Sequence, residues 1–166
     1  MGERLTENDV KKIQAEIEYR KLTVRKEAIE AVKEARAQGD LSENFEYYAA
    51  KKDKNKNESR IRYLERMLKT AEIVSEDSKA DEAGMNNVIE VYFEDDDETE
   101  TYKLVTSIRG NSLDKISIES PLGKAILGHR EGDRVWVKIN ESAGYYIVIK
   151  KILKNTDDTE DEIKSF

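Results

Sequence analysis

The sequence predicts an α+β protein in which an antiparallel coiled-coil hairpin of two helices precedes a small antiparallel sheet with one short helix. Up to residue 76, apolar residues recur every three or four positions in two runs, and a short turn with a glycine separates the runs. Beyond residue 87 apolar and polar residues alternate, which is typical of strands. Charged residues make up 39% of the chain and apolar residues 37%. This composition favours an elongated helix pair with exposed charge over one large core.

The first helix is expected to begin at a capping signal formed by Thr6 and Asp9 and to run for about 30 residues. Its apolar stripe comprises Val10, Ile13, Ile17, Val24, Ala28, Ala31 and Ala35. Arg20 stands where the stripe calls for an apolar residue, so we expect looser packing there or an arginine that extends to solvent. Gly39 follows the stripe and suits the end of the helix.

The second helix has the more regular pattern. Its seam comprises Tyr47, Ala50, Lys54, Asn57, Ile61, Leu64, Leu68 and Ala71, spaced three and four residues apart as in a coiled coil. Lys54 and Asn57 are polar, and we interpret Asn57 as a residue that restricts the register at a cost in stability. Because the connection between the runs is short, the two helices must fold back on each other as a rod of roughly 45 Å.

In the second half of the chain, the sequence predicts short strands and one helix. The expected strands are 87–93, 99–108, 115–119, 134–139 and 145–149, with an acidic turn over 94–98 and a helix over 121–127 that starts at Pro121. The predicted domain organisation is a hairpin over 1–76, a polar linker over 77–86, a sheet domain over 87–154 and an acidic tail over 155–166.

The charge is unevenly divided between the two halves. Residues 1–76 hold 17 Lys and Arg against 16 Asp and Glu, whereas residues 77–166 hold 12 against 20. The acidic second half argues against duplex DNA as its partner, since binding to phosphates requires a basic face. The chain has no Cys, which excludes disulfides and Cys-based sites. No apolar stretch approaches the roughly 20 residues of a membrane-spanning helix, so we expect a cytoplasmic protein.

Two carboxylates, Asp40 and Glu43, lie in the turn between the helices, in the segment Gly39-Asp40-Leu41-Ser42-Glu43-Asn44-Phe45-Glu46-Tyr47. One interpretation is a capping box, in which Asp40 caps the second helix and Glu43 returns to its backbone. The other is a pair of oxygen ligands that a hard cation such as Mg²⁺ could share with a partner's site. Two carboxylates alone would make a weak site, and the spacing by itself leaves both interpretations open.

Basic and aromatic residues gather just beyond this turn. The cluster comprises Lys51, Lys52, Lys54, Lys56, Arg60 and Arg62, with Arg36 on the opposing helix at a similar height. It is either an ordinary solvated helix face or a surface that contacts the phosphates of a single strand, with aromatic side chains stacking on bases. Tyr47 belongs to the seam, which leaves Phe45 and Tyr48 as exposed candidates for stacking.

Other residues are given structural roles. His129 has no catalytic partner nearby in the sequence and is assigned a surface or turn position. Trp136 lies in an alternating strand and is expected in the core. No phosphate-binding Gly-rich loop, nucleophile elbow or zinc-ligand spacing occurs in the chain.

The segment from Gly39 to Tyr47, preceded by Glu34-Ala35-Arg36, resembles the coiled-coil tip of bacterial Gre-type transcript cleavage factors. The stretch Ser120-Pro121-Leu122-Gly123-Lys124-Ala125-Ile126-Leu127-Gly128, followed by Gly132-Asp133, is similar to the family's other recurring segment. The resemblance runs from about Leu5 to Ile152. In overall acidity the chain looks more like GreA than the more basic GreB. Arg20 departs from the family, since it replaces a usual seam aliphatic.

The resemblance implies a sheet domain of FKBP-like fold that docks on RNA polymerase beside its secondary channel, while the coiled coil enters the channel. Asp40 and Glu43 would then help to hold the polymerase's second Mg²⁺, so that the polymerase cleaves backtracked RNA. The resemblance further implies that Arg36 and Lys51 contact the 3′ segment of the nascent RNA, and our interpretation of the cluster adds Lys52, Phe45 and Tyr48. We expect no cofactor of the chain's own, no membrane partner and a monomer. The alternatives are a regulator that enters the channel and inhibits and, more remotely, a peptidyl-prolyl isomerase.

Overall fold

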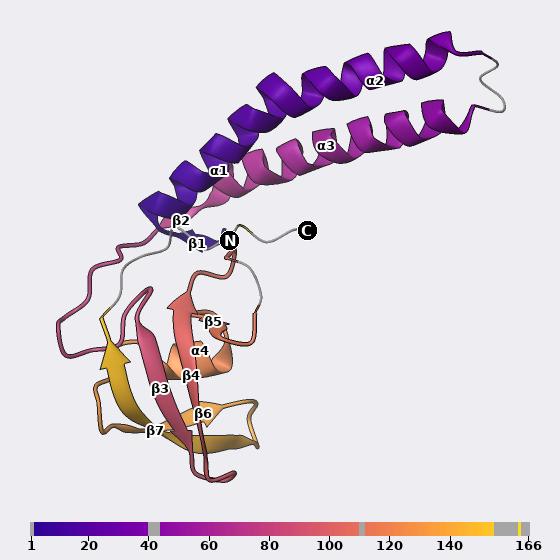
Figure 1. The fold of residues 1–166 in the computed structure, drawn as a ribbon. Helices are drawn as coiled ribbons and strands as arrows, with labels where there is room; N and C mark the ends of the chain where they lie inside the picture. Colours follow the sequence, from indigo (N-terminus) through magenta and orange to yellow (C-terminus); the bar gives the residue numbers. More distant parts are fainter. Residues whose placement is uncertain (1, 40–43, 110–111, 155–162, 164–166) are drawn as a thin grey trace. The chain divides into compact units, whose positions relative to one another are not determined.

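The computed structural model describes residues 2–39, 44–109, 112–154 and 163 (Figure 1). They form two compact units. Most of the first is Glu7–Glu72, and the second combines Arg4–Thr6 with Ile73–Ser165. The first unit is a helical hairpin, and the second contains a five-stranded sheet with one short helix. The predicted α+β fold class is therefore confirmed.

The first arm of the hairpin is interrupted by a wider helical turn. It consists of α1 (Glu7–Tyr19), a π-helical segment η1 (Arg20–Val24) and α2 (Arg25–Ala37). The Arg25 N–H donates to the Arg20 carbonyl five residues back, where an α-helix would use four. Beyond this turn Ala28 and Ala35 keep their predicted places in the stripe, but Val32 is half-buried whereas Ala31 is exposed. The prediction for Ala31 was therefore wrong.

The second arm is one continuous helix, α3 (Phe45–Thr70). The polar side chain of Asn44 caps it by accepting a hydrogen bond from the Tyr47 N–H at 3.0 Å. The predicted seam faces the other arm, with Tyr47, Asn57, Ile61 and Leu64 buried. A spacing of three and four residues predicts the buried face of this helix, because no irregular turn interrupts α3.

Several strands of the second unit pair with strands that are distant in the sequence. Short β1 (Arg4–Leu5) and β2 (Glu72–Ile73) form a two-stranded sheet. The larger sheet has the order β5-β4-β3-β7-β6. Its elements are β3 (Val88–Phe93), β4 (Glu98–Val105), β5 (Lys115–Ser117), β6 (Arg134–Lys138) and β7 (Gly144–Leu153), with α4 (Pro121–Ile126) between β5 and β6.

The larger sheet differs from the predicted antiparallel meander in two ways. β5 pairs parallel with β4. In addition, β7 lies between β3 and β6, antiparallel to both. The sheet is therefore mixed, a property that hydrophobic alternation within single strands cannot reveal.

The core of the second unit corrects two further predictions. Ala83 and Met85, expected in the linker over 77–86, are buried among the core residues, because the polar residues around them mask their apolar character. Trp136, expected in the core, is 47% exposed. In β6 the alternation places Val135 and Val137 in the core instead, and Trp136 therefore faces outward.

A buried arginine fastens several segments of this unit together. Arg109 is 1% exposed. Its guanidinium donates to the Asn86 side chain, to Thr6 Oγ1 at 3.0 Å and to Glu76 Oε1 at 3.4 Å. Breaking a buried, hydrogen-bonded charge pair typically costs about 3–5 kcal/mol. We therefore expect Arg109→Met to lower the free energy of unfolding by about 3 kcal/mol, as measured by urea denaturation.

Arg130→Met is the matched control for that substitution. Arg130 pairs with Asp81 at 2.8 Å, but both side chains are more than half exposed. Exposed ion pairs contribute about 0–1 kcal/mol, so this variant should unfold almost like the parent chain. Equal losses from the two substitutions would show that the burial of Arg109 carries no special stability.

Candidate functional site

The predicted tip carboxylates, Asp40 and Glu43, lie outside the described residues. The structure does show the two helix ends on either side of them. α2 ends at Ala37, and Gly39 adopts φ +141°, a conformation that favours glycine. Across the hairpin, the Asn44 side chain donates to the Ala35 carbonyl. Both helix ends therefore lie at the same end of the hairpin (Figure 1), and residues 40–43 connect them.

The start of α3 bears on the capping interpretation of the acidic segment. The N-cap residue is Asn44, and the residue whose N–H it accepts is Tyr47. A capping box for this helix would therefore comprise Asn44 and Tyr47. The capping interpretation of Asp40 and Glu43 at this helix is thus wrong, because the helix begins four residues later than that interpretation requires.

Arg36 and Tyr47 form a contact between the arms next to the acidic segment. Arg36 Nη2 donates to the Tyr47 hydroxyl at 3.2 Å, and the guanidinium carbon lies 5.4 Å from the ring centroid. The hydrogen bond from Arg36, reinforced by the charge of Lys51, lowers the pKa of Tyr47. The tyrosine is nearly buried, which confirms it as a seam residue. Arg36 therefore has a structural partner, although its side chain stays at the rim of the hairpin.

The other candidates for nucleic-acid contact are exposed, except for the half-buried Lys54 and for Arg60 in the basic cluster. Phe45 is 85% exposed and Tyr48 is 52% exposed, and both Lys51 and Lys52 lie in the solvent-exposed part of α3. Arg60 is only 7% exposed and pairs with Glu16 at 2.9 Å. The surface-cluster interpretation is therefore wrong for Arg60, whereas the other four side chains are available to a partner.

Among the described residues, no group of three or more His, Cys, Asp or Glu is arranged to hold a metal ion. His129 Nδ1 lies 3.3 Å from Asp133 Oδ2, and both side chains are partly exposed. A backbone hydrogen bond from Arg130, aided by His129, lowers the pKa of Asp133. This pair is a surface turn contact, in agreement with the role assigned to His129.

Comparison with known proteins places both halves of the chain. Residues 3–73 match the family described as transcription elongation factor, N-terminal. Residues 77–154 match the one described as transcription elongation factor, GreA/GreB, C-term. The chain belongs to the GreA/GreB family of transcription elongation factors.

Relatives within the GreA/GreB family cover most of the chain. GreA of Thermoanaerobacter pseudethanolicus is 44% identical over 137 residues, which are 81% of this chain and 87% of that protein. GreA of Lachnoclostridium phytofermentans is 42% identical over 149 residues, 88% of this chain and 92% of that protein. Among solved structures, the transcription factor Gfh1 matches with 28% identity and a TM-score of 0.46, over 92% of this chain and 97% of that one. Within the described residues, no helix has the length and apolar character to cross a membrane.

Proposed function

We propose that this GreA/GreB family member binds RNA polymerase and stimulates the polymerase's own cleavage of backtracked RNA, without being an enzyme by itself. The observation that carries the proposal is the acidic segment with Asp40 and Glu43 at the end of a family hairpin, in a position where α3 does not need it as a cap. In this proposal the sheet unit docks on the polymerase, and the hairpin presents the segment to the polymerase active site. The chain would act in the cytoplasm as a monomer.

The donor set of the tip suits a shared Mg²⁺. Asp40 and Glu43 offer carboxylate oxygens, the ligands that Mg²⁺ prefers, and Mg²⁺ usually takes only one or two protein carboxylates. When bound, the ion would polarise the phosphodiester and activate a water molecule. The chain itself would supply two ligands and rely on the polymerase for the others, so we propose no cofactor of its own.

The exposed residues next to the tip suit the 3′ end of the nascent RNA. Lys51 and Lys52 are cations that can contact phosphates, and Phe45 and Tyr48 present aromatic faces on which bases can stack. Arg36 lies across from them and can add a further phosphate contact while it remains bonded to Tyr47. These contacts would stabilise displaced RNA beside the tip without taking part in bond cleavage.

Replacement of Lys51 and Lys52 by alanine tests this RNA surface. We expect a loss of cleavage of about 3–10-fold in complexes backtracked by several nucleotides, little change after backtracking by one or two, and a weaker dependence on salt. Measurement of cleavage rates over a series of salt concentrations checks all three expectations.

Lys33→Ala is the control for the lysine variants. Lys33 is 70% exposed on α2 and pairs only weakly with Glu30, at 3.9 Å. Its removal should leave cleavage unchanged at every salt concentration. If the Lys51 and Lys52 variants behave in the same way, the basic residues are only a solvated helix face.

The proposed function is tested by adding the full chain to a stalled, backtracked polymerase complex and measuring release of short 3′ RNA fragments. Faster release supports the proposal. Slower nucleotide addition without fragment release would instead indicate a regulator that inhibits. The isomerase alternative rests only on the FKBP-like fold that the resemblance implies, and a fold alone does not imply a function.

A further inference from the structure

A layer of polar side chains crosses the hairpin between its base and its tip. Glu16 of α1 accepts hydrogen bonds from Arg60 Nε at 2.9 Å and Arg60 Nη2 at 3.2 Å on α3. Arg20 Nε donates to the same Glu16 carboxylate at 2.7 Å. Burial raises the pKa of Glu16, but the hydrogen bonds from the two arginines outweigh it and leave the pKa below its ordinary value. Glu16 is therefore held as a carboxylate between two cations.

Asn57 joins this layer to the irregular turn of the first arm. Its Oδ1 accepts from Arg20 Nη1 at 2.9 Å, and its Nδ2 donates to the Arg20 carbonyl at 3.2 Å. That carbonyl also receives the Arg25 N–H that closes the π-helical turn. Asn57 is only 4% exposed, so its amide is shielded from water and directed at the one place where the helix of the first arm widens.

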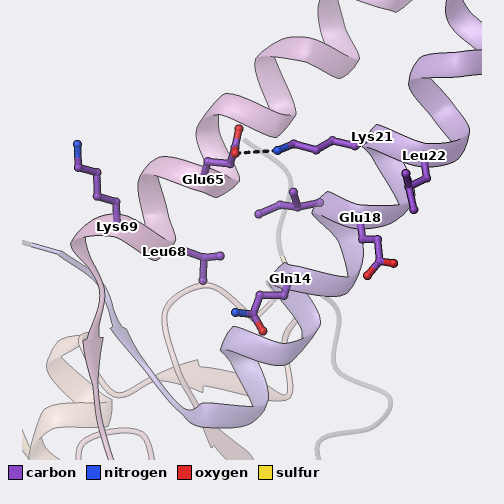
Figure 2. A pocket seen from close by; sticks show the side chains of 8 residues that line it. Gln14, Glu18, Lys21, Leu22, Glu65, Leu68 and Lys69 are labelled. Carbon is purple, nitrogen blue, oxygen red and sulfur yellow. Dashed lines mark hydrogen bonds and ion pairs between the residues drawn. The ribbon is translucent and has the colours of Figure 1, made fainter.

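An open groove lies on the surface of the hairpin beside this layer. This groove of about 590 Å³ runs between the arms, and its apolar lining includes Ile17, Leu22 and Leu68 (Figure 2). Across the groove, Lys21 Nζ pairs with Glu65 Oε2 at 3.0 Å, but both side chains are partly exposed. Such a pair contributes little. Ile13, Ile61 and Leu64 are buried beside the layer, so the polar layer adds directional contacts to an apolar seam.

We propose that Asn57 and Arg20, supported by the Glu16–Arg60 pair, are positioning residues for transcript cleavage: they hold the π-helical turn and the register of the arms, and so place Asp40 and Glu43. This inference rests on the proposed function. The wider turn sets the rotation of α2, because each residue of a helix turns by about 100°. α2 leads directly to the acidic segment. A change in the rotation of α2 about its axis, or in the register of the two arms, would therefore move the carboxylates.

Directional contacts explain why the layer can select one arrangement. A slip of one arm by a helical turn would place the Asn57 amide opposite an apolar side chain and separate Arg60 from Glu16. Buried polar groups without partners are strongly disfavoured, whereas an apolar seam tolerates several registers. Catalysis is sensitive to such shifts, since a displacement of about 1 Å can cost about 100-fold in rate. A role in positioning therefore differs from a role in stability.

Three variants of the full chain separate these roles. Asn57→Leu removes the amide but supplies an apolar seam residue, and the double variant Glu16→Met/Arg60→Met replaces the buried ion pair with side chains of similar length. Ile61→Val is the matched control, since Ile61 is 2% exposed in the next turn of the seam and outside the layer. Cleavage at saturating concentration and the melting temperature are measured for each.

A second measurement does not require polymerase. The chain has no Cys, so Glu30→Cys on α2 and Asp53→Cys on α3, both at exposed positions, can carry spin labels. Electron–electron distance measurements then report the position of one arm relative to the other. We expect the distance distribution to shift or broaden in both layer variants and to stay unchanged in Ile61→Val.

The expected result is a loss of cleavage of about tenfold in both layer variants, with a melting temperature equal to or above that of the parent chain. Ile61→Val should melt earlier and cleave normally. The inference is overturned if the layer variants cleave normally, whether or not the distances change, or if activity follows the melting temperature across all three. If the parent chain stimulates no cleavage, the proposed function fails. In that case, unchanged distances in the layer variants would show separately that the polar layer does not hold the register of the arms.

Discussion

Asp40→Asn and Glu43→Gln should each reduce stimulation of RNA cleavage by at least about 100-fold while leaving binding to polymerase nearly unchanged. Each substitution keeps the shape of the side chain but removes the charge that attracts Mg²⁺, and lost stabilisation of this kind typically costs about 10²–10³ in rate. Since the carboxylates supply ligands for Mg²⁺ and not affinity for polymerase, a higher concentration of the variant should not restore cleavage. The measurement is a single-turnover cleavage rate at saturating protein, beside a binding titration.

Glu46→Gln is the matched control for the tip variants. Glu46 is an exposed carboxylate in the first turn of α3, only three residues beyond Glu43, and should be dispensable for cleavage. Stability provides a second control. Because Asn44 caps α3, the tip variants should not show the loss of about 1 kcal/mol expected for a missing cap. Normal cleavage by the tip variants would contradict the assignment of Asp40 and Glu43.

Separation of the two units should separate binding from activity. A fragment of residues 73–166 should bind polymerase and compete with the full chain, without stimulating cleavage. A fragment of residues 1–72 should stimulate cleavage only at a concentration about 10²–10⁴-fold higher, since it lacks the unit that raises its effective concentration at the channel. Cleavage rates as a function of fragment concentration measure the difference.

The boundary after residue 72 follows the main division between the two units, although it leaves Arg4–Thr6, and with them the Thr6 contact of Arg109, on the hairpin fragment. A cut near residue 86, at the end of the predicted linker, would remove Ala83 and Met85 from the core and Glu76 from its contact with Arg109. Circular dichroism should confirm that each fragment is folded before its activity is compared. A hairpin fragment as potent as the full chain would show that the sheet unit does not provide docking.

The sequence predicted the hairpin well because its evidence is periodic. The seam of α3 from Tyr47 to Leu64 repeats every three or four residues, and each of its residues is buried or half-buried. The prediction that Asn57 restricts the register stays untested, but the structure gives it a partner in Arg20. The tip motif was equally specific in sequence, although residues 40–43 lie outside the described part of the chain.

The errors occur where tertiary contacts outweigh local pattern. Arg20 was expected either to loosen the seam or to extend to solvent, whereas it is hydrogen-bonded to Asn57 and Glu16 at a π-helical turn. The clue in the sequence was the pairing of polar residues one turn apart on both arms, Glu16 with Arg20 and Asn57 with Arg60. The parallel pairing of β5 with β4 has no periodic signal in the sequence.

The Mg²⁺ dependence of cleavage tests the central claim most directly. Backtracked complexes are titrated with Mg²⁺ in the absence of the protein, with the parent chain, and with the Asp40→Asn/Glu43→Gln double variant. If the hairpin delivers two ligands to the polymerase site, the parent chain lowers the Mg²⁺ concentration for half-maximal cleavage, and the double variant returns it to the value without protein. Identical Mg²⁺ dependence with the parent chain and the double variant would contradict the claim that these carboxylates share the metal.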